Sequence, residues 1–162
     1  MNKIEFLPIG VIHSPFQNTT GTPIQAVAAA EVNGSIEVFP EYVDGLKDLG
    51  GFSHLMLFYH LHLVKTKALI VTPFLDNDSH GCFATRSPSR PNSIGFSVVK
   101  LVAVTGNILQ IQGVDIINDT PLLDIKPYIP DFDSFTNCDI GWFEKNRHKL
   151  HQVKDDGRFS SL

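Results

Sequence analysis

Two arginines, Arg86 and Arg90, lie in a proline-rich run from Thr85 to Gly95 that contains no acidic residue. An arginine side chain binds a carboxylate or phosphate through two parallel hydrogen bonds, and each proline fixes one backbone φ angle. A stiff loop of this kind suits an anionic ligand, because it has little conformational freedom to lose on binding. A rigid surface connection with solvated arginines is the alternative interpretation.

A second polar cluster spans residues 115–128 and follows a short apolar run. Turn formation explains Asn118 and Asp119 without any function. Asp124 is different, because an acid between two aliphatic residues needs a partner if it is buried. Lys126 and the loop arginines are the candidate partners, so a structural ion pair and a catalytic carboxylate both stay open.

Three histidines share one face of the segment His54–Val64 if this segment is a strand, namely His54, His60 and His62. A metal site is one interpretation, but no carboxylate follows at ligand spacing. We favour the other interpretation, in which His62 lines a polar pocket and His54 is a hydrogen-bonded histidine. We therefore expect no metal.

Short β-branched and aromatic runs, punctuated by 12 glycines and 10 prolines, predict an all-β fold with minor α content. The expected strands are Ile4–Ile12, Ala30–Phe39, His54–Val64, Ala68–Phe74, Gly81–Thr85, Ile94–Val104, Ile108–Val114 and Leu122–Ile125. Gly106 and Asn107 predict a hairpin turn, and a short helix is expected over Glu41–Leu49. Pro8 predicts that the first strand lies at an edge or is bulged.

The length of 162 residues and the hydrophobic content of 43 % suffice for one compact core. Cys82 and Cys138 lie far apart and lack metal-ligand spacing, so we expect free thiols in a reducing compartment. The sequence shows neither the apolar core of a signal peptide nor a membrane-spanning run, which predicts a cytoplasmic protein. Motifs of Rossmann dinucleotide sites, P-loops, zincins and GxSxG hydrolases are absent.

Basic side chains gather after Gly141, although the net charge of the whole chain is −4. We expect a main β domain over residues 1–140 and a basic, partly helical tail over residues 141–162. The tail is either a solvated end or a surface that contacts a nucleic acid backbone.

The most specific feature of the sequence is a set of four blocks at Gly10–Phe16, Gly51–Leu55, Phe83–Ser97 and Asp119–Tyr128. In this order the blocks resemble the signature of the TrmO (YaeB/TsaA-like) family. The resemblance implies a single small antiparallel β-barrel, unlike the Rossmann-type methyltransferases. It implies S-adenosylmethionine-dependent methylation of N6 of threonylcarbamoyladenosine at tRNA position 37, next to the anticodon, by a homodimer with the cofactor close to the subunit interface.

The resemblance also implies a cofactor site in this chain. Its residues are Gln25, Ala26, Val27, His62, Leu63, Arg86, Phe96, Ile117, Asn118, Asp119 and Thr120. The chemistry agrees with this set, because Arg86 can clamp the carboxylate of S-adenosylmethionine and Phe96 can pack against its adenine.

Methyl transfer to nitrogen requires an in-line approach, and loss of the N6 proton would help a poor nucleophile. Asp124 is therefore the first candidate for a base, with Tyr128 stacking on or holding the flipped adenosine and Asn92 accepting a hydrogen bond. Arg90 and Lys126 are expected to contact the tRNA backbone or the threonyl carboxylate.

Two positions depart from the family pattern. Ser93 replaces a usual proline, and Asp119 replaces a common glycine, which would allow a positive φ angle. Two other functions stay open. One is a non-catalytic β-barrel that binds a nucleotide or anionic metabolite, and the other is a small hydrolase or isomerase that uses His60, His62 and Asp124 without S-adenosylmethionine.

Overall fold

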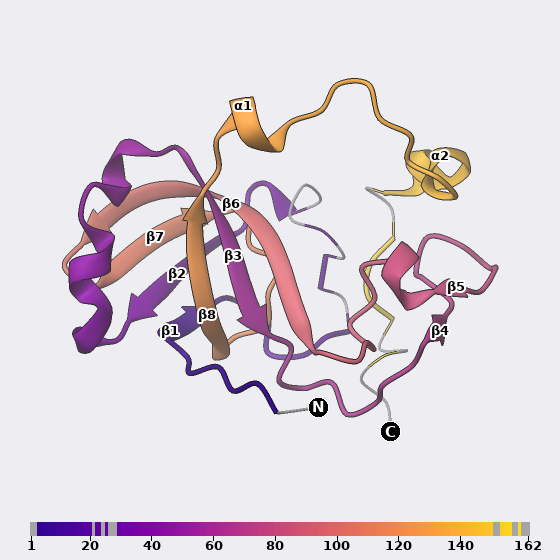
Figure 1. Cartoon of the computed structure of the whole chain (residues 1–162), viewed down its shortest axis with the longest axis horizontal. Helices are drawn as coiled ribbons and strands as arrows, with labels where there is room; N and C mark the ends of the chain where they lie inside the picture. The colour runs from indigo at the N-terminus through magenta and orange to yellow at the C-terminus, as the bar shows by residue number, and fades with distance from the viewer. Residues whose placement is uncertain are drawn as a thin grey trace.

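Six antiparallel strands form a closed barrel in the order β1-β2-β7-β6-β3-β8 (Figure 1). The strands are β1 (Gly10–His13), β2 (Asn33–Val38), β3 (His54–His60), β6 (Ile94–Thr105), β7 (Ile108–Gln112) and β8 (Thr120–Pro127). This computed structural model describes residues 3–20, 22–23, 25, 29–150, 153–156 and 159. The predicted all-β fold and the small antiparallel barrel are confirmed.

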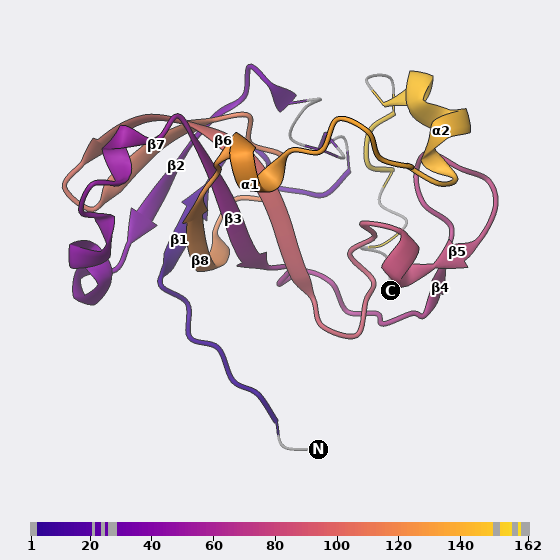
Figure 2. The same ribbon diagram turned by 45° about the horizontal axis from the view of Figure 1, so that its top comes forward.

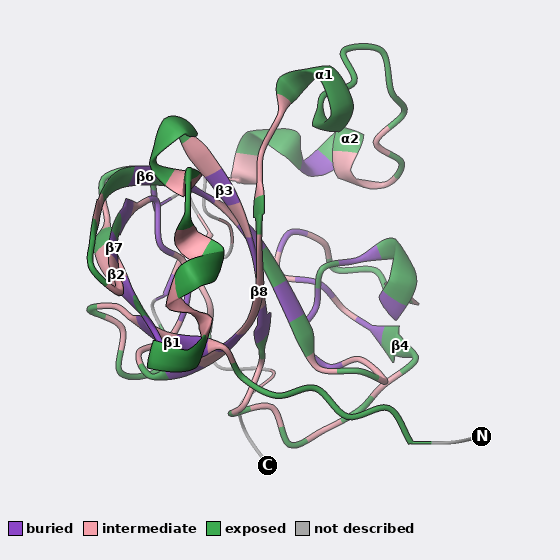
Figure 3. Ribbon diagram, turned by 60° about the vertical axis from the view of Figure 1, so that its left-hand side comes forward, coloured by how far each residue is buried: buried purple, intermediate pink, exposed green. Residues whose placement is uncertain are grey.

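Period-two alternation along the strands fills the barrel interior. On β3, Leu55, Leu57 and Tyr59 point inward and are buried, while Met56 and Phe58 between them are half-buried on the outside. Figure 3 shows the same alternation of buried and more exposed segments around the barrel wall. Burial of one large aliphatic side chain contributes about 1.5–3 kcal/mol, so the inward-facing set is the main stabilising element of the domain.

The hairpin predicted at Gly106 and Asn107 is confirmed. It joins β6 to β7, and Gly106 has a φ angle of +60°, which glycine adopts without steric cost. The helix expected over Glu41–Leu49 is present as two short 3-10 helices, η2 (Pro40–Leu46) and η3 (Leu49–Gly51).

The first predicted strand is shorter than expected, because residues 3–9 form no strand and β1 begins at Gly10. Pro8 therefore precedes the barrel. At its other end, β3 stops at His60, where Leu61 N donates to Ser93 O and His62 N donates to His60 O. These two bonds turn the chain away from the barrel.

The strand predicted over Gly81–Thr85 is wrong. The chain instead forms the two-residue strand β5 (His80–Gly81), which pairs with β4 (Ile70–Val71), and then a 3-10 turn, η4 (Cys82–Ala84). The carbonyl of Cys82 accepts hydrogen bonds from both the backbone N and the Oγ1 of Thr85, which closes this turn.

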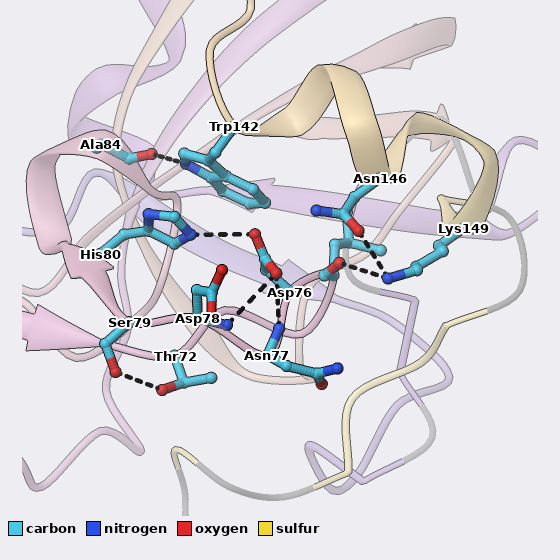
Figure 4. A network of polar contacts seen from close by, with 11 residues as sticks. Thr72, Asp76, Asn77, Asp78, Ser79, His80, Ala84, Trp142, Asn146 and Lys149 are labelled. Carbon is cyan, nitrogen blue, oxygen red and sulfur yellow. Dashed lines mark hydrogen bonds and ion pairs between the residues drawn. The ribbon is translucent and has the colours of Figure 1, made fainter.

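Residues 61–93 leave the barrel between β3 and β6 and form a side lobe that contains β4, β5 and η4 (Figures 1 and 2). The carboxyl-terminal helices α2 (Phe143–Asn146) and η5 (Arg147–Lys149) lie against this lobe, beyond α1 (Pro130–Asp133). The Trp142 indole donates to Ala84 O at 2.8 Å and stacks on His80, with ring centres 4.8 Å apart (Figure 4). None of the helices in the described ranges is long and apolar enough to cross a membrane.

Candidate functional site

A cavity of about 280 Å³, the main cavity, opens where the barrel meets the side lobe. Residues of the predicted cofactor site line it, namely Gln25, His62, Leu63, Arg86, Phe96, Ile117 and Thr120. They come from five separate stretches of the sequence, so the fold brings together most of the set that the resemblance implies. Ala26 and Val27 lie outside the described residues.

Arg86 lies at the centre of this set. Its Nη1 donates to Gln25 Oε1 at 2.7 Å, and its guanidinium carbon lies 5.9 Å from the centre of the Phe96 ring. A guanidinium has five N–H donors, so the bond to Gln25 leaves capacity for a bidentate grip on a carboxylate. The adjacent aromatic face favours the cation electrostatically.

Arg90 holds the shape of the loop that carries Arg86. Its Nη1 donates to Thr85 O at 3.1 Å and to Ser87 O at 3.0 Å, and its side chain also lines the main cavity. Ser89 adds a hydroxyl contact of 3.0 Å to Thr66 of the side lobe. The tRNA contact expected for Arg90 stays a prediction, but the observed bonds give this side chain a structural role inside its own loop.

The turn before β8 has the backbone geometry that the family's glycine suggests. Asp119 has a φ angle of +60°, and its Oδ1 lies 3.2 Å from His13 Nδ1. Asn118 Oδ1 accepts a hydrogen bond from Ser14 N at 3.0 Å, which ties the turn to the end of β1. The departure at residue 119 is therefore accommodated by a left-handed aspartate, a residue that tolerates this region better than most.

His62 lines the main cavity as predicted. Burial lowers the pKa of His62, so its imidazole is neutral at pH 7. Its Nδ1 lies 3.5 Å from Thr120 Oγ1, and that hydroxyl donates to Ile117 O at 2.7 Å.

The three histidines are not grouped at one place in the fold. His54 Nδ1 is bonded to Ser53 Oγ at 3.0 Å, His60 is exposed on the barrel surface, and His62 lies beyond the end of β3. Throughout the described ranges, no three histidine, cysteine, aspartate or glutamate side chains are grouped so that they could hold a metal ion.

The candidate catalytic residues predicted from the sequence lie elsewhere. Asp124 pairs with Lys126 at 2.8 Å on the barrel surface, and about half of each side chain is exposed. The backbone N of Tyr128 donates to His54 O, and Asn92 is exposed in the proline-rich run from Thr85 to Gly95. Within the described part of the chain, none of these four side chains lines the main cavity. Their roles stay predictions, and the ion pair left open for Asp124 is present.

Sequence reasoning missed a buried polar chain beneath the cavity. The Tyr59 hydroxyl lies 2.9 Å from Ser97 Oγ, which donates to Asp115 Oδ1 at 2.7 Å. Burial, and then the charge of Asp115, raises the pKa of Tyr59. Asp115 lines the cavity. The signal that could have found these bonded side chains is that the alternation places polar Ser97 inward on a strand whose other inward residues are apolar.

The carboxyl-terminal tail also contributes to the cavity, which the sequence did not indicate. Asp155 N donates to Thr22 O at 3.0 Å, and the rings of Phe159 and Phe74 lie 5.1 Å apart. Asp155 and Phe159 both line the main cavity. The tail therefore lies across the loop after β1 and forms part of the wall.

Comparisons with known proteins agree with this geometry. Residues 11–134 match the family model described as the tRNA-methyltransferase O N-terminal domain. A probable S-adenosyl-L-methionine-binding protein of Pyrococcus abyssi is 57 % identical over 157 residues, which are 97 % of this chain and 85 % of that protein. The mouse tRNA (adenine(37)-N6)-methyltransferase is 37 % identical over 95 % of this chain and 37 % of its own length.

Solved structures give the same result. The crystal structure of TrmO from Pseudomonas aeruginosa superposes with a TM-score of 0.74 at 33 % identity, and the match covers 88 % of this chain. This chain spans 62 % of that solved chain.

Proposed function

Since the chain belongs to the TrmO family, we propose that it is an S-adenosylmethionine-dependent tRNA methyltransferase acting on N6 of threonylcarbamoyladenosine at position 37. One observation carries this proposal. Arg86, Gln25 and Phe96, from three separate segments, meet at one cavity, each at a position that the family resemblance predicts. The name of the mouse relative states the same tRNA position and the same nitrogen.

The donor set of the main cavity fits S-adenosylmethionine. Arg86 offers parallel N–H donors to the α-carboxylate, Phe96 offers an aromatic face to the adenine, and neutral His62 offers an acceptor to an amino group. Asp155 provides negative charge for a ligand that carries an ammonium and a sulfonium. When bound, this group supplies a methyl carbon that is already activated for attack, so the protein mainly has to position the acceptor.

The remaining parts of the proposal concern the acceptor side and the assembly. Asp124, Tyr128 and Asn92 stay the sequence-based candidates for the catalytic groups, and Arg90 and Lys126 for the tRNA contacts. The division into a barrel domain at residues 1–140 and a basic tail at residues 141–162, and the cytoplasmic location, are further expectations.

A homodimer is also part of the proposal. The side lobe exposes Leu69, Ile70 and Phe83, with 65 %, 66 % and 78 % of each residue accessible. Neighbouring exposed apolar side chains support a protein interface on this lobe, and a second copy of the chain is the expected partner. Light scattering on the purified protein measures its mass and tests this expectation.

A second candidate function is cofactor binding without methyl transfer. The name of the Pyrococcus relative states binding of S-adenosyl-L-methionine and no reaction. The Arg86 site serves such a protein equally well, so only an assay of transfer separates the two.

The deciding experiment incubates the protein with methyl-labelled S-adenosylmethionine and tRNA from a strain that lacks the endogenous enzyme. Digestion to nucleosides should place the label on threonylcarbamoyladenosine. The matched control is the same tRNA without the threonylcarbamoyl group, and it should receive less label. Cofactor binding with no label on either tRNA would favour the second candidate.

A further inference from the structure

A second hollow, of about 440 Å³, lies on the outer face of the barrel and adjoins the main cavity. We name it the outer hollow. The two spaces adjoin along a shared boundary, the partition, because Gln25, Arg86, Phe96 and Asp115 line both. A ligand in one space and a ligand in the other would therefore meet at this partition.

One side of the outer hollow is a row of polar side chains across three strands. His54 on β3 lies opposite Lys100 on β6, and Lys100 lies opposite Gln112 on β7. Lys100 is exposed and forms no ion pair with any of the residues that the structure describes. Besides Arg86, which we assign to the cofactor, the outer hollow thus offers the cation of Lys100 beside a hydrogen-bonding amide, which suits an anionic, polar ligand.

Asp115 is held at the partition by the buried chain beneath it. Ser97 Oγ uses its single proton toward Asp115 Oδ1, so the Tyr59 hydroxyl is the donor to Ser97. Both Ser97 and Tyr59 are more than nine-tenths buried. The carboxylate is therefore positioned before any ligand arrives.

From this arrangement we propose that the outer hollow takes the acceptor adenosine, and that Asp115 is the carboxylate beside its attacking nitrogen. The inference rests on the proposed function. In-line transfer needs the nitrogen about 3 Å from the methyl carbon, and two adjoining spaces that share lining residues place the two reactants side by side. Asp124 lines neither space within the described ranges.

The step balances in atoms and charge. The N6 nitrogen forms its bond to the methyl carbon as the sulfur–methyl bond breaks, and the bonding electrons stay on sulfur, which becomes a neutral thioether. The N6 proton passes to the Asp115 carboxylate and later to water. Lys100 faces the negative group of the acceptor, either its threonyl carboxylate or a neighbouring phosphate.

The test compares Asp115→Asn with the wild type in single-turnover methylation of tRNA. Asparagine keeps an acceptor for Ser97 but cannot take a proton, so the rate should fall by about 100-fold or more. Affinities for S-adenosylmethionine and for tRNA, measured by calorimetry and filter binding, should change less than about twofold. Asp44→Asn, which alters an exposed carboxylate on η2, is the matched control and should keep the wild-type rate.

Several outcomes would overturn the inference. A wild-type rate in Asp115→Asn would remove Asp115 as the base, as would a large loss confined to Asp124→Asn. Weaker cofactor binding with a normal rate at saturating cofactor would assign Asp115 to the methyl donor instead. If the wild type itself binds the cofactor but methylates no tRNA, the proposed function fails, and that result is distinct from all of these.

A second variant tests the hollow itself. Lys100→Gln should weaken tRNA binding several-fold and leave cofactor binding unchanged. If Lys100 meets a phosphate, the salt dependence of tRNA binding should also lose about one unit of slope, whereas contact with the threonyl carboxylate should weaken binding only of tRNA that carries this group. Unchanged binding of both tRNA forms would place the acceptor elsewhere.

Discussion

The ring of Tyr59 on β3 fills the space beside Gly95, its antiparallel partner on β6. A methyl group at residue 95 would overlap the ring atoms Cε2 and Cζ. This placement of the ring brings its hydroxyl to Ser97, two residues further along β6. Gly95, part of the Phe83–Ser97 block, is thus required by the packing of the barrel interior.

Gly95→Ala should destabilise the protein by about 1–3 kcal/mol, because the added methyl group forces the buried ring to move. Urea unfolding measures the loss. Gly81→Ala is the matched control, since no atom lies within 4 Å of an added methyl group there, and it should stay within about 0.5 kcal/mol of the wild type. Equal stability of the two variants would contradict the overlap.

Tyr59→Phe should cost about 0.5–1.5 kcal/mol at neutral pH, the net contribution of one buried hydrogen bond. The pKa of Tyr59 is raised in the folded state, so the unfolded chain releases the phenol proton first, near pH 10. This contribution is therefore full below about pH 10 and declines as the pH rises further. Urea unfolding from pH 7 to 11 should show the wild type losing stability faster than Tyr59→Phe above pH 10. Parallel curves of stability against pH for the two proteins would contradict this contribution of Tyr59.

Arg86→Ala should weaken S-adenosylmethionine binding by about 1.5–3 kcal/mol, the range for hydrogen bonds to a charged group. Isothermal titration calorimetry gives this value directly. Lys47→Ala removes an exposed cation far along the chain from the cavity loops and serves as the control. Unaltered affinity in Arg86→Ala would exclude the carboxylate clamp.

The relative stability of variants at Asp119 should depend on the backbone conformation at this residue. Its φ angle of +60° disfavours alanine and suits glycine, so Asp119→Gly should be about 1 kcal/mol more stable than Asp119→Ala. Thermal unfolding of the two variants side by side checks the difference. Both variants lack the carboxylate that contacts His13, so the reverse order would contradict the backbone preference itself.

Trp142→Ala should loosen the tail, because it removes both the stack on His80 and the bond to Ala84 O. The loss is about 0.5–1.5 kcal/mol for the aromatic pair, and residues 141–150 should exchange amide hydrogens faster. Cofactor binding should weaken as well, since the tail supplies Asp155 and Phe159 to the cavity wall. Phe132→Ala, at a residue that is 71 % exposed, is the control and should change neither measurement.

Most of the barrel could be predicted, because its strands alternate inward and outward residues over their own length. The hairpin at Gly106 is similarly local. The side lobe could not be predicted in the same way. Strand β5 ends after two residues because Thr85 donates a hydrogen bond to the carbonyl of Cys82 and forms a turn there. The apolar residues in this segment do not indicate that hydrogen bond.

The functional site likewise has residues that could be predicted from the sequence and residues that could not. The convergence of Arg86, Phe96 and His62 followed from the family resemblance, whereas the positions of Asp115 and Phe159 depend on partners far away in the sequence. Ser97 holds Asp115, and Phe74 contacts Phe159. Residue type and motif position favoured Asp124 as the base, and the sequence left open the ion pair with Lys126 that the structure shows at the surface.

The seam between β1 and β8 closes the barrel, with Ile12 opposite Thr120. At the same seam Ser14 N meets Asn118 Oδ1, across a sequence separation of 104 residues. Contacts of such long range have a large loop-closure entropy and are slow to form. During refolding, the part of the cavity wall formed by residues 117–120 should therefore form when the barrel closes, after its hairpins have formed. Ligand binding should return later than the spectroscopic signal of the β-sheet.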